Sequence, residues 1–181
     1  MLTLETSRLL LRRWRDSDRV PFAAINADEQ VRRYYYPSLL TAQETDELID
    51  EADRHLAREG VGFLAVERKA DKVLIGGAGL SRPGSEVPGN FPLEIGWILG
   101  RAHWRQGYAT EISHRWLDFA WLQLRAECVI GYTSCINDPS RRAMRKIGMT
   151  RVEDGDFDDV TVPPGHILRP HVLYRIDRPG Q

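Results

Sequence analysis

The chain has 181 residues, of which 42% are hydrophobic and 28% charged, and its formal net charge is -1. This length favours a single domain over residues 1–181, and the composition is that of a globular protein with enough apolar material for a core. The balanced charge gives no reason to expect a nucleic-acid or membrane partner. No apolar run approaches the roughly 20 residues that cross a bilayer, and the N-terminus lacks the apolar run of a signal peptide. We therefore expect a cytoplasmic protein.

Cysteine and histidine positions give no indication of a metal site. Cys128 and Cys135 lack metal-ligand or redox spacing, so we expect buried thiols in a reducing compartment. Four histidines are equally unlike a ligand set in their spacing: His103, His114, His166 and His171.

The first sixty residues predict one strand and three helices. Residues 8–14 have the apolar look of a strand, and Asp16 or Asp18 can cap a short helix through Asn26 in which Pro21 fits only the first turn. A second short helix is expected over residues 28–33, ending before Tyr34 to Pro37.

The third of these helices carries the clearest boundary signals. Thr41 and Glu44 form a capping-box pattern, and Gly60 ends the helix. The apolar spacing predicts a buried face, made of Leu48, Ile49, Ala52 and Leu56.

The remaining residues alternate between strands and helices. Two β runs, 61–69 and 73–81, read as a hairpin in which Gly76, Gly77 and Gly79 indicate a bulge or a close backbone approach. After a loop over 82–92 we expect, in order, a strand (91–99), a helix (108–123), a strand (127–134), a helix (138–147) and two strands (149–153 and 171–176). This order predicts a mixed α/β sheet with helices on both faces.

The stretch from Glu94 to Glu111 combines a strand, a break at Gly100, a basic loop and a turn of small residues that enters a helix. Such a turn points free backbone N–H groups at an anion, and a pyrophosphate is the obvious candidate. Neither the dinucleotide fingerprint nor the P-loop sequence is present. A tight turn that only serves packing is the alternative.

Four motifs in order resemble the GNAT family of N-acetyltransferases, and among them the RimJ and RimL branch of ribosomal-protein enzymes. They are Glu94-Ile-Gly-Trp97, the run WRQGYATE from Trp104 to Glu111, Asn137-x-x-Ser140-x-Arg142, and Lys146-Ile-Gly148-Met149. The two ends of the chain, TSRLLLRRW and HVLYRI, are similar to those of the branch as well. The resemblance implies a single-domain fold with a mixed, splayed β-sheet and acetyl-CoA as cosubstrate.

The resemblance implies how the cofactor is held. Its pyrophosphate would be bound by the backbone N–H groups of Arg105, Gln106, Gly107, Tyr108, Ala109 and Thr110. Ile98 and Leu99 would pair with pantetheine as a pseudo-strand, and one of their N–H groups would polarise the thioester carbonyl. Asn137 and Arg142 would complete the cofactor site. Where the wider family has Arg or Gln, this chain has Trp104, so Arg105 or Arg101 would supply the charge.

The catalytic assignment begins with Glu94. An acceptor amine must lose a proton before it attacks, and the Glu94 carboxylate is the candidate base, with a structural ion pair as the alternative. Ser140 is the candidate donor to the CoA thiolate, although capping explains Ser140 and Asn137 equally well. Met144 stands where many relatives have a tyrosine acid, so water is the other proton source.

The acceptor is the least defined part. The resemblance implies a primary amine, on a protein N-terminus or a small molecule, with Tyr35 and Tyr36 as binding residues. The acidic residues between Glu153 and Asp159 can attract a cationic acceptor or form a solvated turn. Transfer would be direct and without a metal, and a homodimer fits the resemblance. The alternative function is a non-catalytic acyl-CoA-binding or regulatory module.

Overall fold

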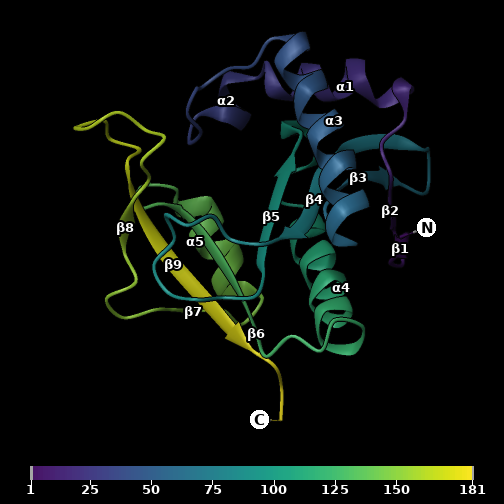
Figure 1. Ribbon diagram of the computed structural model, residues 1–181. Coiled ribbons are helices and arrows are strands. Elements are labelled where there is room, and N and C mark those ends of the chain that lie inside the picture. Colours follow the sequence, from purple (N-terminus) through teal and green to yellow (C-terminus); the bar gives the residue numbers. More distant parts are fainter. Residues whose placement is uncertain (1, 181) are drawn as a thin grey trace.

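The computed structural model describes residues 2–180 and contains one mixed sheet with helices on both faces (Figure 1). In the described residues the sheet has 9 strands in the order β1-β2-β3-β4-β5-β6-β9-β7, with β8 also paired to β9. The strands are β1 (Leu4–Glu5), β2 (Leu9–Arg12), β3 (Phe63–Arg68), β4 (Val73–Ser81), β5 (Glu94–Leu99), β6 (Cys128–Ser134), β7 (Thr150–Arg151), β8 (Phe157–Asp158) and β9 (Pro170–Asp177).

The helices fall into two groups along the chain. The first group precedes the hairpin and the second follows β5; the α-helices are α1 (Asp16–Asn26), α2 (Glu29–Arg32), α3 (Ala42–Glu59), α4 (Tyr108–Leu122) and α5 (Asp138–Lys146). A short 3-10 helix, η1 (Arg101–His103), lies between β5 and α4.

Adjacent residues of β5 show that the two groups cover opposite faces of the sheet. Ile98 packs in a cluster with Phe22 of α1 and Ile49 of α3. Leu99, the next residue, packs in a cluster with Trp116 of α4 and Met144 of α5. Because successive side chains of a strand point to opposite faces, α1 to α3 lie on one face and α4 and α5 on the other, as the sequence predicts.

β5 and β6 run parallel and separate almost at once. Within the described residues their register contains one pair, Glu94 with Ile130, supported by a hydrogen bond of 2.9 Å from the Ile130 N–H to the Leu93 carbonyl. Beyond that pair the two strands diverge (Figure 1). The sheet is therefore splayed, and β5 has an open edge facing β6.

The third helix confirms its predicted ends and corrects one core position. Thr41 and Glu44 form the capping box, and Gly60 ends α3 in a left-handed conformation. Leu48, expected in the core, is 46% exposed. It is adjacent to the buried Ile49 and so points about 100° away on the helix; Thr45 takes its place on the buried face.

The other local predictions hold with shifts. Pro21 lies inside α1 and not in its first turn, so α1 forgoes one backbone hydrogen bond there. The strand expected over 149–153 is confined to β7, and the short strands β1 and β8 were not predicted. Cys128 is buried, whereas Cys135 is only partly buried, and both thiols are free. No helix among residues 2–180 has the length and hydropathy to span a membrane.

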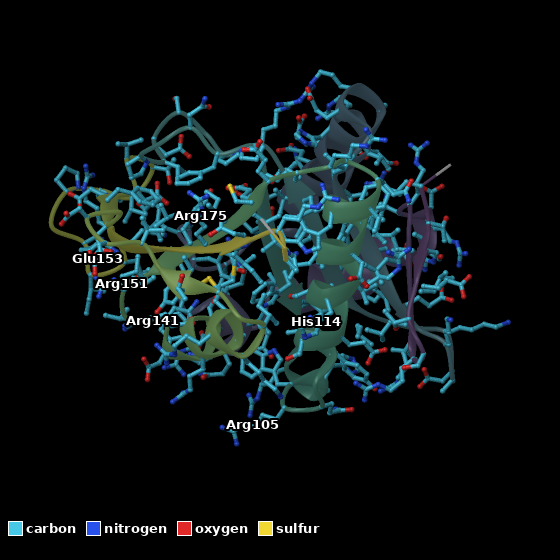
Figure 2. The ribbon with its side chains drawn as sticks, turned by 90° about the horizontal axis from the view of Figure 1, so that it is seen from below. Arg105, His114, Arg141, Arg151, Glu153 and Arg175 are labelled. Atoms are coloured by element: carbon cyan, nitrogen blue, oxygen red, sulfur yellow. The ribbon has the colours of Figure 1, made fainter. Side chains whose placement is uncertain are left out.

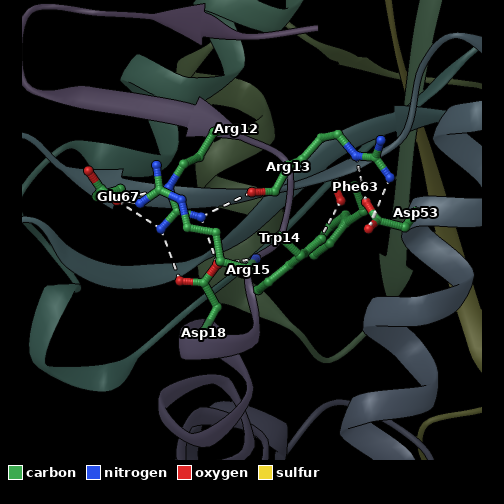
Figure 3. Close-up of polar contacts among 8 residues, drawn as sticks. All are labelled: Arg12, Arg13, Trp14, Arg15, Asp18, Asp53, Phe63 and Glu67. Carbon is green, nitrogen blue, oxygen red and sulfur yellow. Dashed lines mark hydrogen bonds and ion pairs between the residues drawn. The ribbon is translucent and has the colours of Figure 1, made fainter. Parts of the chain in front are cut away.

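A buried ion-pair network fixes β2, α1 and β3 to one another (Figure 3). The Arg12 guanidinium donates to Asp18 at 2.6 Å and 2.9 Å and to Glu67 at 2.8 Å. All three side chains are less than 10% exposed. Asp18 also accepts from the Arg15 N–H at 2.8 Å and so ties the start of α1 to the network. This orients the helical layer over the face that carries Ile98.

Candidate active site

Close backbone contact positions β5 against β4. Gly76 has a φ of +148°, and a β-carbon there would lie 2.1 Å from the Ile98 carbonyl oxygen. A β-carbon at Gly79 would lie 2.1 Å from the Gly62 carbonyl oxygen. The close approach expected from the glycine run is confirmed, and it sets β5 in place along one edge while its other edge is open.

The turn before α4 presents a helix N-terminus without a side-chain cap among residues 2–180. Gly107, at the N-cap, has a φ of +81°, and Arg105 has a φ of +60°. Alternating left-handed residues form a concave turn whose N–H groups converge, and the first N–H groups of a helix have no partner inside it. Figure 2 shows Arg105 at the edge of the molecule, beyond the start of α4. The turn therefore fits a pyrophosphate.

An arginine from the N-terminal segment, which the sequence analysis did not identify, contacts this turn. Arg8 donates to the Gln106 carbonyl at 3.0 Å and to the Glu111 carboxylate at 2.7 Å. Its guanidinium lies 4.5 Å from the centre of the Tyr108 ring. No local spacing links residues 8 and 111, so only the fold reveals the contact.

The open edge of β5 corrects the predicted role of Ile98. The Gly100 N–H donates to the Ile75 carbonyl of β4 at 2.9 Å. Backbone groups alternate in direction along a strand, so Ile98 likewise turns its N–H and C=O toward β4. Trp97 and Leu99 turn theirs toward the opening, where a pseudo-strand would pair.

Side chains already contact two carbonyls of this open edge. The Trp104 indole donates to the Leu99 carbonyl at 2.7 Å, and the Tyr35 hydroxyl donates to the Trp97 carbonyl at 3.3 Å. Trp104 thus stabilises the end of β5. Tyr35 brings the loop between α2 and α3 to the opening.

Glu94 lies where β5 and β6 part. One carboxylate oxygen, Oε1, accepts from the Ser81 hydroxyl at 2.8 Å. The other, Oε2, is buried and has no hydrogen-bond partner among residues 2–180. Burial raises the pKa of Glu94, and the Ser81 hydrogen bond opposes that rise in part. Beside it on the same face, a β-carbon at Gly96 would meet nothing within 4 Å. A carboxylate with one unpaired, buried oxygen therefore lies next to a position on β5, Gly96, that has room for a further group.

Tyr132 of β6 is a second residue that the sequence analysis missed. It lies two positions beyond Ile130, the register partner of Glu94, and packs against Phe157 and His171 with ring centres 5.4 Å and 6.1 Å away. Burial, with the Glu94 charge, raises the pKa of Tyr132, so its hydroxyl stays a neutral hydrogen-bond donor. The Tyr132 hydroxyl lowers the pKa of Glu94, but its effect is smaller than those of burial and of Ser81.

Asn137 is the N-cap of α5 and Ser140 lies in its first turn, soon after the end of β6. The Asn137 amide donates to the Thr133 hydroxyl at 2.8 Å and its carbonyl oxygen accepts from the Ser140 N–H at 3.3 Å. Capping thus accounts for the contacts of Asn137. Arg142 is exposed and lies 3.5 Å from Asp138, and Met144 is buried in the core.

The remaining acceptor candidates lie farther out on the loops. Tyr36 is exposed and packs edge-on against His166, with ring centres 5.4 Å apart. Within the acidic loop, Asp156 pairs with Arg151 and Asp158 pairs with Arg169. These ion pairs favour the structural interpretation of the acidic residues.

An uncapped helix N-terminus, an open strand edge and a carboxylate with one unpaired oxygen all lie between Glu94 and the start of α4, an arrangement that suits a transferase that uses an acyl-CoA. A family model described as acetyltransferase (GNAT) domain matches residues 8–150. The chain belongs to this family and is an acyltransferase; its family uses acetyl-CoA to acetylate amines.

Related proteins agree with this family. The chain is 26% identical over 182 residues to the uncharacterized N-acetyltransferase p20 of Bacillus licheniformis, covering 98% of both chains. A GNAT-family acetyltransferase from Bacillus anthracis superposes with a TM-score of 0.80 at 23% identity, covering 97% of this chain and 98% of that one. RimL, a ribosomal L7/L12 α-N-protein acetyltransferase in complex with coenzyme A, superposes with a TM-score of 0.77 at 11% identity. The match covers 97% of this chain and 98% of RimL. The two structural likenesses show the fold.

Proposed function

We propose that this chain transfers an acetyl group directly from acetyl-CoA to a primary amine, with Glu94 as the general base. The observation that carries the proposal is the free Oε2 of Glu94, which is buried at the opening of the sheet. An ion pair would explain a buried carboxylate as structure, but the Glu94 contact is with the Ser81 hydroxyl. A carboxylate with raised pKa takes a proton more readily than an ordinary one.

The cofactor end follows from the turn and the open edge. Acetyl-CoA supplies an activated acyl group as its thioester. Its pyrophosphate is bound by the N–H groups of residues 107–110. Pantetheine pairs with the backbone of Trp97 and Leu99, so Trp97 takes the role expected for Ile98. The Leu99 N–H is the donor that stabilises negative charge on the acyl oxygen. Arg105 supplies the side-chain charge.

The acceptor amine enters the space above Gly96, between Glu94, Tyr35 and Tyr132. The Tyr132 hydroxyl donates to the carboxylate or to the amine in this space. Ser140 or water protonates the leaving thiolate. A protein N-terminus, as acted on by RimL, and a small amine, such as the spermidine acetylated by a Vibrio cholerae enzyme of similar fold, are the two acceptor classes.

The test is an acceptor screen followed by one substitution. Peptides with free N-termini and small amines are incubated with acetyl-CoA while release of the CoA thiol is measured. With the best acceptor, Glu94→Gln should lower kcat by about 10²–10⁴-fold, the usual contribution of a general base. The Kd for acetyl-CoA should stay near that of the unchanged protein, because Glu94 lies away from the phosphate turn.

Two outcomes would contradict the proposal. Unchanged turnover in Glu94→Gln removes Glu94 from the mechanism. CoA binding without transfer to any amine in the screen instead favours a binding or regulatory module.

A further inference from the structure

The proposed phosphate-binding turn, residues 105–107 and the start of α4 (the phosphate turn), is followed closely by an acidic residue. Glu111 lies in the first turn of α4, close after Gly107. A carboxylate at this end of a helix is stabilised by the helix dipole, but it repels any other anion bound there. A site for a pyrophosphate therefore has to neutralise Glu111.

The segment before β2 provides that neutralisation. Glu111 Oε2 lies 2.6 Å from Arg8 Nη2, and Oε1 accepts from the Arg8 N–H at 3.1 Å and from the Ser7 hydroxyl at 3.3 Å. The Thr6 hydroxyl donates to the same oxygen. Burial pulls the pKa of Glu111 upward, but the hydrogen bonds from Thr6 and Arg8 outweigh it and hold the pKa below its usual range. Glu111 is thus an anion whose charge Arg8 balances.

Arg8 also fixes the orientation of the turn. Its Nη1 donates to the Gln106 carbonyl at 3.0 Å. The Gln106 C=O and the Gly107 N–H belong to one planar trans peptide and point in opposite directions. Holding the carbonyl toward Arg8 therefore directs the Gly107 N–H away from it, toward the open side of the turn.

The rest of the Arg8 side chain lies along the same turn. Its guanidinium stacks over the ring of the buried Tyr108 at 4.5 Å. A β-carbon at Gly107 would be 3.5 Å from Arg8 Nη2, so Arg8 lies on the side where a side chain of residue 107 would project. Arg8 thus contacts Gln106 and Tyr108, the residues on either side of Gly107.

We propose that Arg8 is a positioning residue for the cofactor pyrophosphate, which it serves by balancing Glu111 and by aligning the Gly107 N–H. The proposal rests on the proposed CoA site. It gives Glu111, the last residue of the WRQGYATE run, the role of anchoring Arg8 and not of touching the cofactor. Arg8 acts through the turn, so its removal weakens affinity for the phosphate-bearing part of CoA and leaves the pantetheine part unaffected.

The experiment compares Arg8→Met with Arg13→Met. The two arginines are similarly exposed, at 46% and 43% of their side chains, and Arg13 pairs with Asp53 of α3, away from the turn. Calorimetry with CoA should show a Kd about tenfold or more higher for Arg8→Met, since a hydrogen bond to a charged group is lost and a carboxylate is left unpaired. Arg13→Met should bind CoA as the unchanged protein does.

Further measurements separate positioning from general damage. Binding of pantetheine, which has no pyrophosphate, is followed by NMR titration and should be equal in Arg8→Met and the unchanged protein. The double variant Arg8→Met/Glu111→Gln should recover part of the lost CoA affinity. Arg8→Lys keeps the charge but loses the two-pronged contact of the guanidinium, so it should bind CoA with intermediate affinity. It is the variant to measure if Arg8→Met fails to fold.

The results distinguish two failures. If the unchanged protein does not bind CoA, the proposed function is wrong. If it binds CoA and neither Arg8→Met nor Arg8→Lys differs from Arg13→Met, or if affinity for pantetheine falls equally, the role of Arg8 is refuted.

Discussion

Gly96 and Gly79 are register partners on neighbouring strands, yet a side chain would have opposite consequences at the two positions. A β-carbon at Gly96 would meet nothing within 4 Å, whereas one at Gly79 would lie 2.1 Å from the Gly62 carbonyl oxygen. Gly96→Val therefore fills the proposed acceptor space without a clash at the β-carbon. Gly79→Val forces two strands apart.

The expected magnitudes separate function from stability. A glycine inside a strand costs roughly 0.5–1 kcal/mol of stability relative to alanine. The free energy of unfolding of Gly96→Val should therefore equal or slightly exceed that of the unchanged protein. Its kcat/KM for the acceptor should fall by about 10²-fold, the loss that a misplacement of about 1 Å can cause. Its Kd for acetyl-CoA should be unchanged. Gly79→Val should lose stability, by about 1–3 kcal/mol as in other overpacked sites.

Urea unfolding, calorimetry with acetyl-CoA and the thiol-release assay measure the three quantities. Full acceptor activity in a folded Gly96→Val variant would refute the assignment of this space to the acceptor. Lost stability in that variant would show that the space beside Glu94 is not open.

Two further substitutions test the buried network and the base. Arg12→Met should lower the free energy of unfolding by about 3–5 kcal/mol, because it leaves the buried Asp18 carboxylate without its guanidinium and leaves Glu67 with Arg15 as its cation. The exposed Arg13→Met should cost at most about 1 kcal/mol; equal urea midpoints would contradict this. Ser81→Ala removes a hydrogen bond that lowers the pKa of Glu94. As the proposed base, Glu94 must be ionised to act, so activity is lost as pH falls through its pKa. Ser81→Ala should therefore move the acidic limb of the kcat/KM profile to higher pH. An unmoved limb would show that another group controls it.

Local signals in the sequence predicted the elements well. Thr41, Glu44 and Gly60 define both ends of α3 because capping depends only on neighbours within one turn. The same reasoning failed for Leu48, since the apolar pattern allows two adjacent residues on one face and the packed helix buries only Ile49.

The site was predicted less completely, because much of it depends on pairing between distant strands. Glu94 and the turn at Gly107 lie within one contiguous run, so their motif is visible in the sequence. Ser81 reaches Glu94 through the register of β4 and β5, and Arg8 reaches Glu111 across 103 positions. The direction of the Ile98 backbone groups likewise follows from which edge of β5 is paired. None of these is encoded in local spacing.

The strand order also has a consequence for biosynthesis. β9, the last strand along the described chain, lies between β6 and β7 and pairs with β8 as well. β1 to β5 pair in the order in which a ribosome makes them, so each new strand finds its partner already made. The β1–β5 half of the sheet, which precedes the turn into α4, can pair before residues 170–177 are made, whereas β7 and β8 need those residues as their partner strand. The nascent protein therefore gains the β1–β5 half of its sheet first and the half around β9 last.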